Sequence, residues 1–248
     1  MSTPPHLLLL AGSGEGRAVA ASLAQGSLRV TASLADAAHW SGPLPVVTRH
    51  GGFGGEVGFR AFLRQEGVTA VLDATHPFAA QISARSWAIC HEMGVPYLQI
   101  DRPAWVAEPG DHWTEVPDEA AAAARIRTGA RVFATIGRPL IGPFTALQGI
   151  HVFVRRLTAT PAPPDFKNVT YVPGSGPFSV SDELRTFREL GISVLVCKNS
   201  GGQPSRTKLA AARRLGLPVI LLQRPPATGA PCVDHVADAL AWVQRTCR

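Results

Sequence analysis

The sequence predicts an α/β protein built from two tandem doubly wound domains, each with a parallel sheet, and a cleft between them. Short apolar runs alternate with helical patterns along the whole chain. Strict alternation of strand and helix is typical of βαβ units and therefore of parallel sheets. The chain has 248 residues, which is more than one domain of the commonest size needs and enough for two.

In the first half, apolar runs predict strands that are buried on both faces. These runs are His6–Ala11, Leu28–Leu34, Leu44–Val47, Thr69–Leu72 and Tyr97–Ile100. Periodic stretches between them predict helices at Glu15–Gln25, Glu56–Glu66 and Phe78–Met93. The second half repeats the pattern. Its strands are expected at Val132–Ile136, His151–Arg155, Val194–Cys197 and Val219–Leu222, and its helices at Ser181–Leu190, Ser205–Leu215 and His235–Arg245.

Internal similarity indicates a duplication. Gly94–Pro103 and Gly216–Pro225 share the frame Gly-h-Pro-h-x-x-x-x-Arg-Pro, where h is apolar. Two shorter pairs have closely similar offsets, Val116–Asp118 with Val236–Asp238 and Leu8–Gly12 with Phe133–Gly137. Chance similarity in an alanine-rich sequence is the alternative. We expect two related domains, a cofactor-binding domain at residues 1–128 and a substrate-binding domain at 129–248.

The charge balance favours a polyanionic small molecule. The chain has 24 Lys and Arg against 18 Asp and Glu, and all but three of the basic residues are arginine, whose planar fork suits carboxylates and phosphates. A coding bias toward arginine explains the composition equally well. No basic run and no basic stripe interleaved with aromatic residues occurs, so we expect no nucleic acid as a partner.

The apolar runs and the cysteines indicate a cytoplasmic protein without a metal. The first apolar run, Leu7–Ala11, is far shorter than the ~20 residues that a membrane span needs, so no membrane contact is expected. The four cysteines lie far apart with no Cys-x-x-Cys pair, which fits neither a disulfide framework nor a zinc site.

The turn after the first strand is a candidate phosphate cradle. Gly12, Ser13, Gly14, Gly16 and Arg17 follow a strand and open a helix, where exposed N–H groups and the helix dipole favour an anion. The Rossmann dinucleotide fingerprint has its third glycine where Arg17 stands, and Gly16 comes one residue early. The strand–turn–helix context favours Rossmann-like cofactor binding over an ordinary glycine-rich turn.

The end of the second strand favours NADP over NAD. A cofactor without a 2′-phosphate usually meets Asp or Glu about 20 residues beyond the first glycine, whereas this chain has Ser33 there and no carboxylate before Asp36. A hydroxyl tolerates a phosphate that a carboxylate would repel. Arg17 or Arg49 is expected to supply the positive charge.

Two further loops of the first half are expected to line the site. Gly51 and Gly52 begin a run with four glycines in five positions, which lets backbone approach a ligand closely; a flexible surface turn is the alternative. Asp73, Thr75 and His76 end the fourth strand ahead of Pro77, which is predicted as the first helical residue with Thr75 or His76 as its cap.

These loop residues are given chemical roles. We expect Asp73 and Thr75 to bind cofactor, although local capping explains both equally well. His76 is a candidate proton donor, since imidazole titrates near neutral pH.

In the second half, basic residues at strand ends are expected to bind substrate carboxylates between the halves. Arg138 and Lys198 each follow a strand, and Ser200 and Gly201 precede a helix expected near Pro204. Lys208 is a further candidate, and Lys198 is also expected to be catalytic. For the basic residues, solvated surface bases are the alternative.

Together these motifs resemble the precorrin-6A reductases of cobalamin biosynthesis over almost the whole chain. The resemblance rests on Gly12–Arg17, Ser33-Leu-Ala, Arg49 with Gly51–Gly55, Asp73–Ala79, Arg102-Pro-x-Trp105, Ile136-Gly-Arg138, and Lys198–Gly202 with Lys208-Leu-Ala-Ala-Ala. It implies NADPH-dependent reduction of one macrocycle double bond of precorrin-6A, giving precorrin-6B, and transient contact with neighbouring pathway enzymes. The alternatives are a cobalt-precorrin-6A reductase and a non-catalytic nucleotide- or tetrapyrrole-binding protein.

Overall fold

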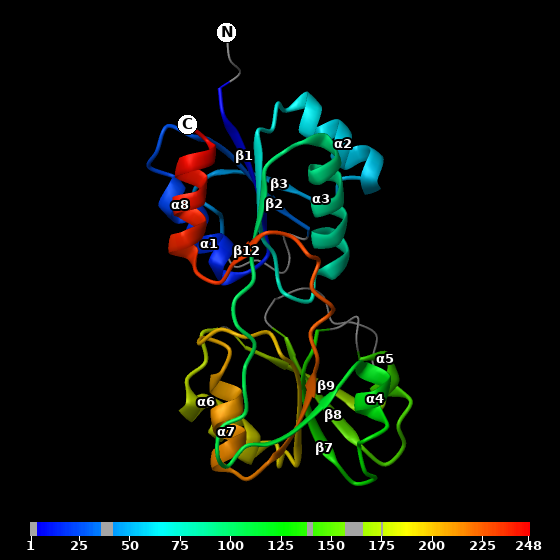
Figure 1. Cartoon of the computed structure of the whole chain (residues 1–248). Coiled ribbons are helices and arrows are strands. Elements are labelled where there is room, and N and C mark those ends of the chain that lie inside the picture. Colours follow the sequence, from blue (N-terminus) through cyan, green and yellow to red (C-terminus); the bar gives the residue numbers. More distant parts are fainter. Residues whose placement is uncertain (1–3, 36–41, 138–140, 157–165, 175) are drawn as a thin grey trace. The chain divides into compact units, whose positions relative to one another are not determined.

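The computed structural model describes residues 4–35, 42–137, 141–156, 166–174 and 176–248 (Figure 1). The chain forms two compact units, one made of the residues up to Pro103 together with Pro225–Arg248, the other of Ala104–Arg224. We call them the cofactor unit and the substrate unit, after the roles that the sequence predicts for them. Each contains a six-stranded sheet in which every pairing is parallel, so the predicted α/β class is confirmed.

The cofactor unit has the strand order β12-β5-β4-β1-β2-β3. Its strands are β1 (His6–Ala11), β2 (Arg29–Leu34), β3 (Val47–His50), β4 (Ala70–Ala74), β5 (Tyr97–Ile100) and β12 (Cys232–Val233). Its helices are α1 (Gly14–Leu23), α2 (Gly55–Gln65), α3 (Ala80–Met93) and α8 (Val236–Thr246).

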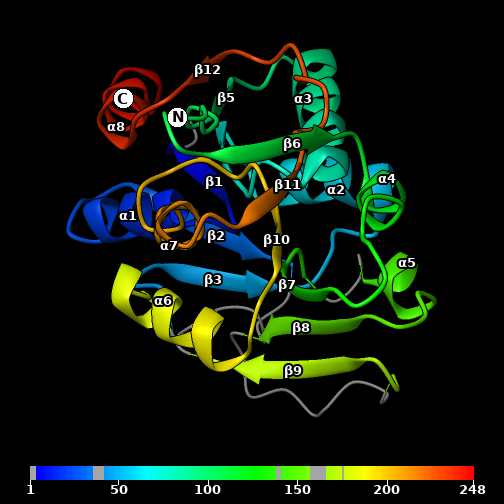
Figure 2. The ribbon, with the colours of Figure 1, turned by 90° about the horizontal axis from the view of Figure 1, so that it is seen from below.

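The substrate unit has the order β6-β11-β10-β7-β8-β9 (Figure 2). Its strands are β6 (His112–Val116), β7 (Arg131–Thr135), β8 (His151–Arg156), β9 (Val169–Pro173), β10 (Val194–Lys198) and β11 (Pro218–Leu222). Its helices are α4 (Glu119–Ala123), α5 (Gly142–Thr145), α6 (Val180–Glu189) and α7 (Thr207–Arg214). Strand for strand, this order matches that of the cofactor unit, as a duplication requires.

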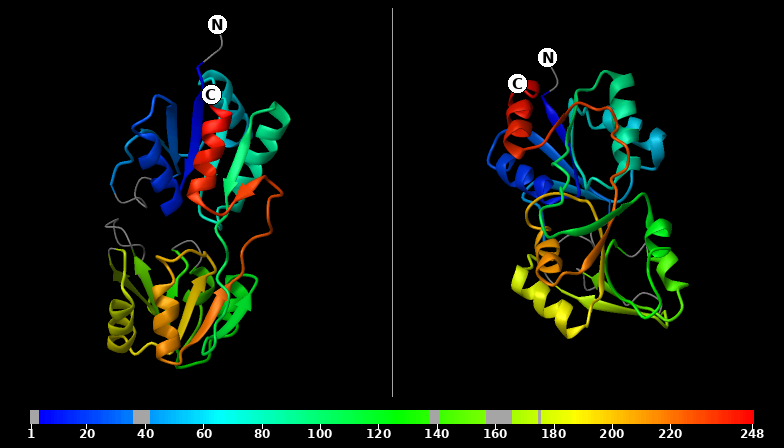
Figure 3. Two further views of the ribbon diagram at one scale, coloured as in Figure 1. Left: turned by 60° about the vertical axis from the view of Figure 1, so that its left-hand side comes forward. Right: turned by 60° about the horizontal axis from the view of Figure 1, so that its bottom comes forward.

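The units exchange their last strand and helix, which corrects the predicted boundary at residues 128 and 129. β6 and α4 follow β5 in the chain, yet β6 pairs with β11 of the substrate unit, with Trp113 opposite Val219. β12 and α8 follow β11, yet β12 pairs with β5 (Figure 3). The chain therefore passes between the units at Pro103 and again at Pro225, the two prolines that end the repeated Arg-Pro frame.

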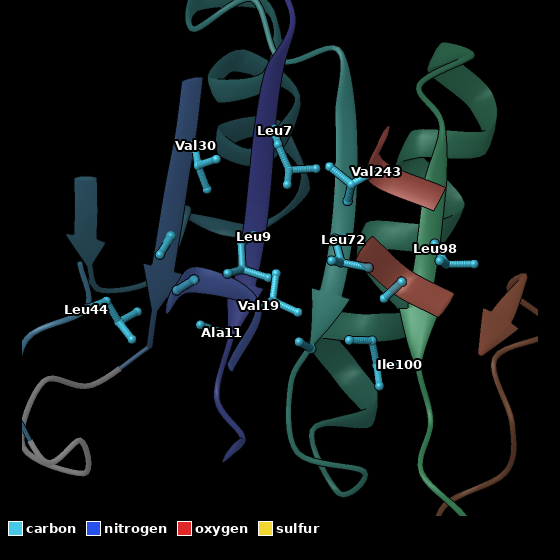
Figure 4. Packing of buried hydrophobic residues seen from close by; sticks show 14 of the residues in the cluster. Leu7, Leu9, Ala11, Val19, Val30, Leu44, Leu72, Leu98, Ile100 and Val243 are labelled. Carbon is cyan, nitrogen blue, oxygen red and sulfur yellow. The ribbon is translucent and has the colours of Figure 1, made fainter. Parts of the chain in front are cut away.

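The central strands of the cofactor-unit sheet are buried on both faces. Leu7 and Leu9 of β1 pack against α1 and α8 through Val19 and Val243 (Figure 4). On the opposite face, Leu8 and Leu10 lie in a second cluster that includes residues of α2 and α3. Alternate residues of a strand point to opposite faces, and helices on both sides explain the continuous apolar run of β1.

Several element boundaries differ from the sequence prediction. The third strand lies at Val47–His50 rather than Leu44–Val47. The helix predicted to begin at Phe78 begins at Ala80. Its N-cap residue is Ala79, whose side chain forms no capping hydrogen bond, so neither Thr75 nor His76 is the N-cap. The sequence pattern does not predict β6, β9 or β12. These are edge or short strands with partly exposed side chains, and such strands lack a buried apolar run.

Because α8 packs on the cofactor-unit sheet, a substitution in α8 should destabilise that unit. Val243 is a fully buried side chain of α8. Val243→Ala removes two methyl groups from the cofactor-unit core and should lower the free energy of unfolding by about 0.5–3 kcal/mol. Hydrogen exchange should rise in β1 and β4 and not in β7 and β10. Faster exchange confined to β7 and β10 would show that α8 stabilises the other unit.

Candidate functional site

The turn after β1 is fixed by Ser13. Its side-chain oxygen accepts a hydrogen bond from the backbone N–H of Gly16 at 3.2 Å and donates one to the carbonyl of Ala74, at the end of β4, at 2.7 Å. A Cβ on Gly16 would lie 3.3 Å from Ala11 and from the Ala74 carbonyl oxygen. Gly16 therefore permits the close packing of helix on strands that the third fingerprint glycine provides elsewhere.

The start of α1 suits an anion. A Cβ on Gly14 would meet no atom within 4 Å, so its backbone is open to a ligand. Glu15 in the first turn forms a 2.5 Å ion pair with Arg102, and both side chains are largely buried. This pairing offsets the negative charge that would repel a phosphate at the helix N-terminus.

The end of β2 carries a positive charge held beside Ser33. Arg49 lies opposite Ser33 in the pairing of β2 with β3, and its Nη1 donates to Ser33 Oγ at 2.7 Å and to the Gly51 carbonyl at 2.9 Å. Its guanidinium lies 4.0 Å from the ring centroid of Phe53. Burial lowers the pKa of Arg49. Arg17 instead donates to the Pro43 carbonyl at 3.4 Å, so of the two predicted arginines it is Arg49 that contacts Ser33.

Asp73 is fully buried at the end of β4 and has two hydrogen-bond donors. One carboxyl oxygen accepts from the backbone N–H of Thr75 at 2.9 Å, the other from the hydroxyl of Tyr97 at 2.6 Å. Burial and the nearby Asp73 raise the pKa of Tyr97. Asp73 thus fixes the turn after β4, and its role as a direct cofactor ligand stays a prediction.

Tyr97 is not among the site residues that the sequence predicts. The available signal was a tyrosine in an apolar strand, because a buried tyrosine hydroxyl usually finds a hydrogen-bond partner.

Thr75 also ties the turn after β4 to α3. Its hydroxyl oxygen lies 3.1 Å from that of Ser83.

His76 follows in the same turn. Its Nδ1 accepts a hydrogen bond from the backbone N–H of Phe78 at 3.2 Å, which leaves Nε2 as the position for a proton. A Cβ on Gly12 would lie 3.5 Å from Thr75 Cα and 3.6 Å from the backbone nitrogen of His76. The structure therefore brings His76 to the phosphate-cradle turn.

In the substrate unit, Lys198 ends β10 and its side chain is partly buried. Burial lowers its pKa, an effect that nearby Glu119 opposes. Ser200 is buried, and its backbone N–H donates to the Lys198 carbonyl at 2.8 Å. Gly201 and Gly202 have φ of 67° and 78°, a left-handed conformation that favours glycine. Arg138 lies outside the described residues.

Lys208 is buried near the start of α7, which begins at Thr207 rather than near Pro204. Its ammonium donates to the Ser205 carbonyl at 2.6 Å and lies 5.0 Å from the ring centroid of Trp105. These contacts direct Lys208 toward its own unit, and its role in binding substrate stays a prediction.

Comparisons with known proteins identify the family. The family model described as precorrin-6x reductase CbiJ/CobK matches residues 6–244. The chain belongs to the precorrin-6x reductase family. This membership confirms the resemblance that the sequence motifs indicate. Within the described residues, no group of three or more His, Cys, Asp or Glu side chains could hold a metal ion, and no helix is long and apolar enough to cross a membrane.

Relatives in the precorrin-6x reductase family match the chain over nearly its full length. A precorrin-6A reductase from Rhodococcus erythropolis is 43% identical over 96% of this chain and 97% of the relative. A cobalt-precorrin-6A reductase from Synechocystis is 28% identical over 96% and 95%. Among solved structures, a CobK precorrin-6A reductase superimposes with a TM-score of 0.91 at 37% identity, covering 98% of this chain and 97% of that one.

Two cysteines beside the candidate sites should be unreactive in the folded protein. Burial and then Asp73 raise the pKa of Cys90 to about 12, and burial raises that of Cys197, which precedes Lys198, to about 11. At pH 8 the thiolate fraction of Cys90 is then roughly one in ten thousand. In a thiol-labelling time course, exposed Cys232 should react first, and Cys90 and Cys197 only after unfolding. Cys247 is partly exposed as well, so fast labelling that persists in the double variant Cys232→Ser, Cys247→Ser would contradict this assignment.

Proposed function

We propose that this protein is an NADPH-dependent precorrin-6A reductase that reduces one double bond of the macrocycle to give precorrin-6B. The observation that carries the proposal is the near-full-length match to precorrin-6A reductases. Such enzymes from Rhodococcus and from Rhodobacter capsulatus are 43% and 38% identical, whereas the cobalt-precorrin-6A reductases of Synechocystis and Priestia megaterium are 28% and 29% identical. The difference favours the metal-free substrate.

The residues present fit a dinucleotide with a 2′-phosphate. The open backbone of Gly14 and the N-terminal amides of α1 would hold the pyrophosphate. Arg49 would pair with the 2′-phosphate beside Ser33, since a guanidinium binds phosphate in a fixed, bidentate geometry. Bound there, the nicotinamide supplies a hydride. The chain's own contribution is to orient the two ligands and to exclude competing reactions.

Lys198 and the loop after it would bind acidic groups of the substrate. Partial burial disfavours the charged form of the lysine, and a substrate carboxylate beside it would favour that form again. Gly201 would present its backbone N–H group and Ser200 its hydroxyl, and Arg138 would add a second positive charge. Such charge-assisted hydrogen bonds are stronger than neutral ones.

The proposed function is tested by mixing the purified protein with NADPH and precorrin-6A and following the absorbance of the reduced nicotinamide. We expect the absorbance to fall in step with formation of precorrin-6B. Turnover with cobalt-precorrin-6A alone would assign the protein to the anaerobic route. Stoichiometric binding without cofactor oxidation would assign it as a binding protein.

Ser33→Asp tests the 2′-phosphate position. The new carboxylate would compete for Arg49 and repel the phosphate. The binding free energy of NADPH should therefore weaken by roughly 1–3 kcal/mol, while that of NADH changes little. Ser33→Asn is the matched control, because it adds similar volume without charge. Calorimetric titration of both cofactors measures the effect. Equal losses for NADPH and NADH would contradict the placement.

His76→Asn tests proton delivery. Asparagine keeps an acceptor for the Phe78 backbone N–H but cannot transfer a proton near neutral pH, so kcat should fall by about 10²–10⁴-fold. The melting temperature and NADPH affinity should stay close to wild type. His76→Ala also removes the acceptor for the Phe78 backbone N–H. Comparing the two variants therefore separates the effect of losing this hydrogen bond from the effect of losing the proton donor. Near-normal kcat with an unchanged pH–rate profile in both variants would show that the histidine is structural.

A further inference from the structure

Asn199, the residue directly after Lys198, forms hydrogen bonds through all four of its polar groups. Its backbone N–H donates to the Leu222 carbonyl at 2.9 Å, and its carbonyl accepts from Nε of Arg224 at 2.9 Å. Its side-chain oxygen accepts from the backbone N–H of Trp105 at 2.8 Å, and its amide nitrogen donates to the Trp105 carbonyl at 3.1 Å. The side chain is buried, as is Trp105.

These partners lie at the two places where the chain passes between the units. Trp105 comes two residues after Pro103, and Arg224 directly precedes Pro225, the prolines at which the units divide. A single residue of the β10–α7 loop therefore holds both connections within the substrate unit. The indole of Trp105 adds a further contact, because its Nε1 donates to the Gly202 carbonyl at 2.9 Å.

These contacts of Asn199 determine the conformation of the loop between β10 and α7. Gly201 and Gly202 are in the left-handed conformation and have little conformational preference of their own. Lys198 itself is held by the pairing of β10 with β11. The direction of the Ser200 side chain and of the Gly201 backbone N–H group, by contrast, depends on what fixes the loop from outside. Asn199 and Trp105 provide those contacts.

We propose that Asn199 is a positioning residue for substrate binding, acting by holding Lys198–Gly202 against both connections. The inference rests on the proposed function, since it takes this loop as the site for substrate carboxylates. Asn199 itself need not contact the substrate, because its side-chain amide is occupied by Trp105. Loss of its hydrogen bonds should misplace the loop and weaken substrate binding, and leave the cofactor unit unchanged.

Asn199→Leu is the direct test, because leucine has similar volume and no hydrogen-bonding group. The KM for precorrin-6A should rise about tenfold or more, while the dissociation constant for NADPH stays within about twofold of wild type. Lys198→Met should share this signature. Phe187→Leu is the control for stability alone: it alters a buried side chain in the core of the same unit, so it should lower the melting temperature without raising KM.

A second variant keeps the test decisive if Asn199→Leu does not fold. Asn199→Asp retains an acceptor for the Trp105 N–H but places an oxygen against the Trp105 carbonyl, so it too should raise KM. An unchanged KM in the folded Asn199 variants, or an equal rise in Phe187→Leu, would overturn the positioning role. Wild-type protein that neither turns over precorrin-6A nor binds it in equilibrium dialysis would overturn the proposed function and this inference together.

Discussion

Each sheet has one edge strand that lies out of sequence order: β12 in the cofactor unit and β6 in the substrate unit. The rest of the structure depends on this exchange of strands. β5 would be an edge strand of the cofactor unit without β12, and β11 would be an edge strand of the substrate unit without β6. Unpaired edges of parallel strands leave backbone groups without partners. The exchange supplies those partners. It also makes the folding of the cofactor unit depend on two segments, one on each side of the substrate unit in the sequence.

The parallel order then decides where chemistry can occur. Because every strand in a unit runs the same way, the carboxyl ends of β1, β2 and β4 meet at one edge of the cofactor unit, which is where ligands bind in open α/β sheets. Ser13 joins the β1 turn to β4 through the Ala74 carbonyl. Asp73 and Tyr97 fix the next turn along this edge. The candidate cradle is therefore held by buried polar contacts beneath it rather than by the loops alone.

The substrate unit uses the same edge with different residues. In the cofactor unit, β4 carries the buried carboxyl of Asp73 near its end and is followed by the turn that contains His76. In the substrate unit, β10 ends at Lys198 and is followed by Asn199. The duplicated frame thus keeps the scaffold and changes the charge at the strand ends. Arg102 and Arg224, equivalent in the repeated frame, also differ in partner: one pairs with Glu15 and the other with the Asn199 carbonyl.

The sequence by itself determined the class of fold, most buried strands, the position of the glycine-rich turn after β1 and the family. Continuous apolar runs, strand-to-glycine turns and specific loop motifs are local signals, and they can be read from one sequence. Tertiary structure alone decided the unit boundary, because edge strands such as β6 and β12 carry no buried run and find their sheet only through pairing. It also decided that Arg49 contacts Ser33, that Asp73 binds Tyr97, and that Asn199 holds Trp105. Each of these contacts joins residues distant in sequence, and long-range hydrogen bonds between buried groups have no local periodicity to reveal them.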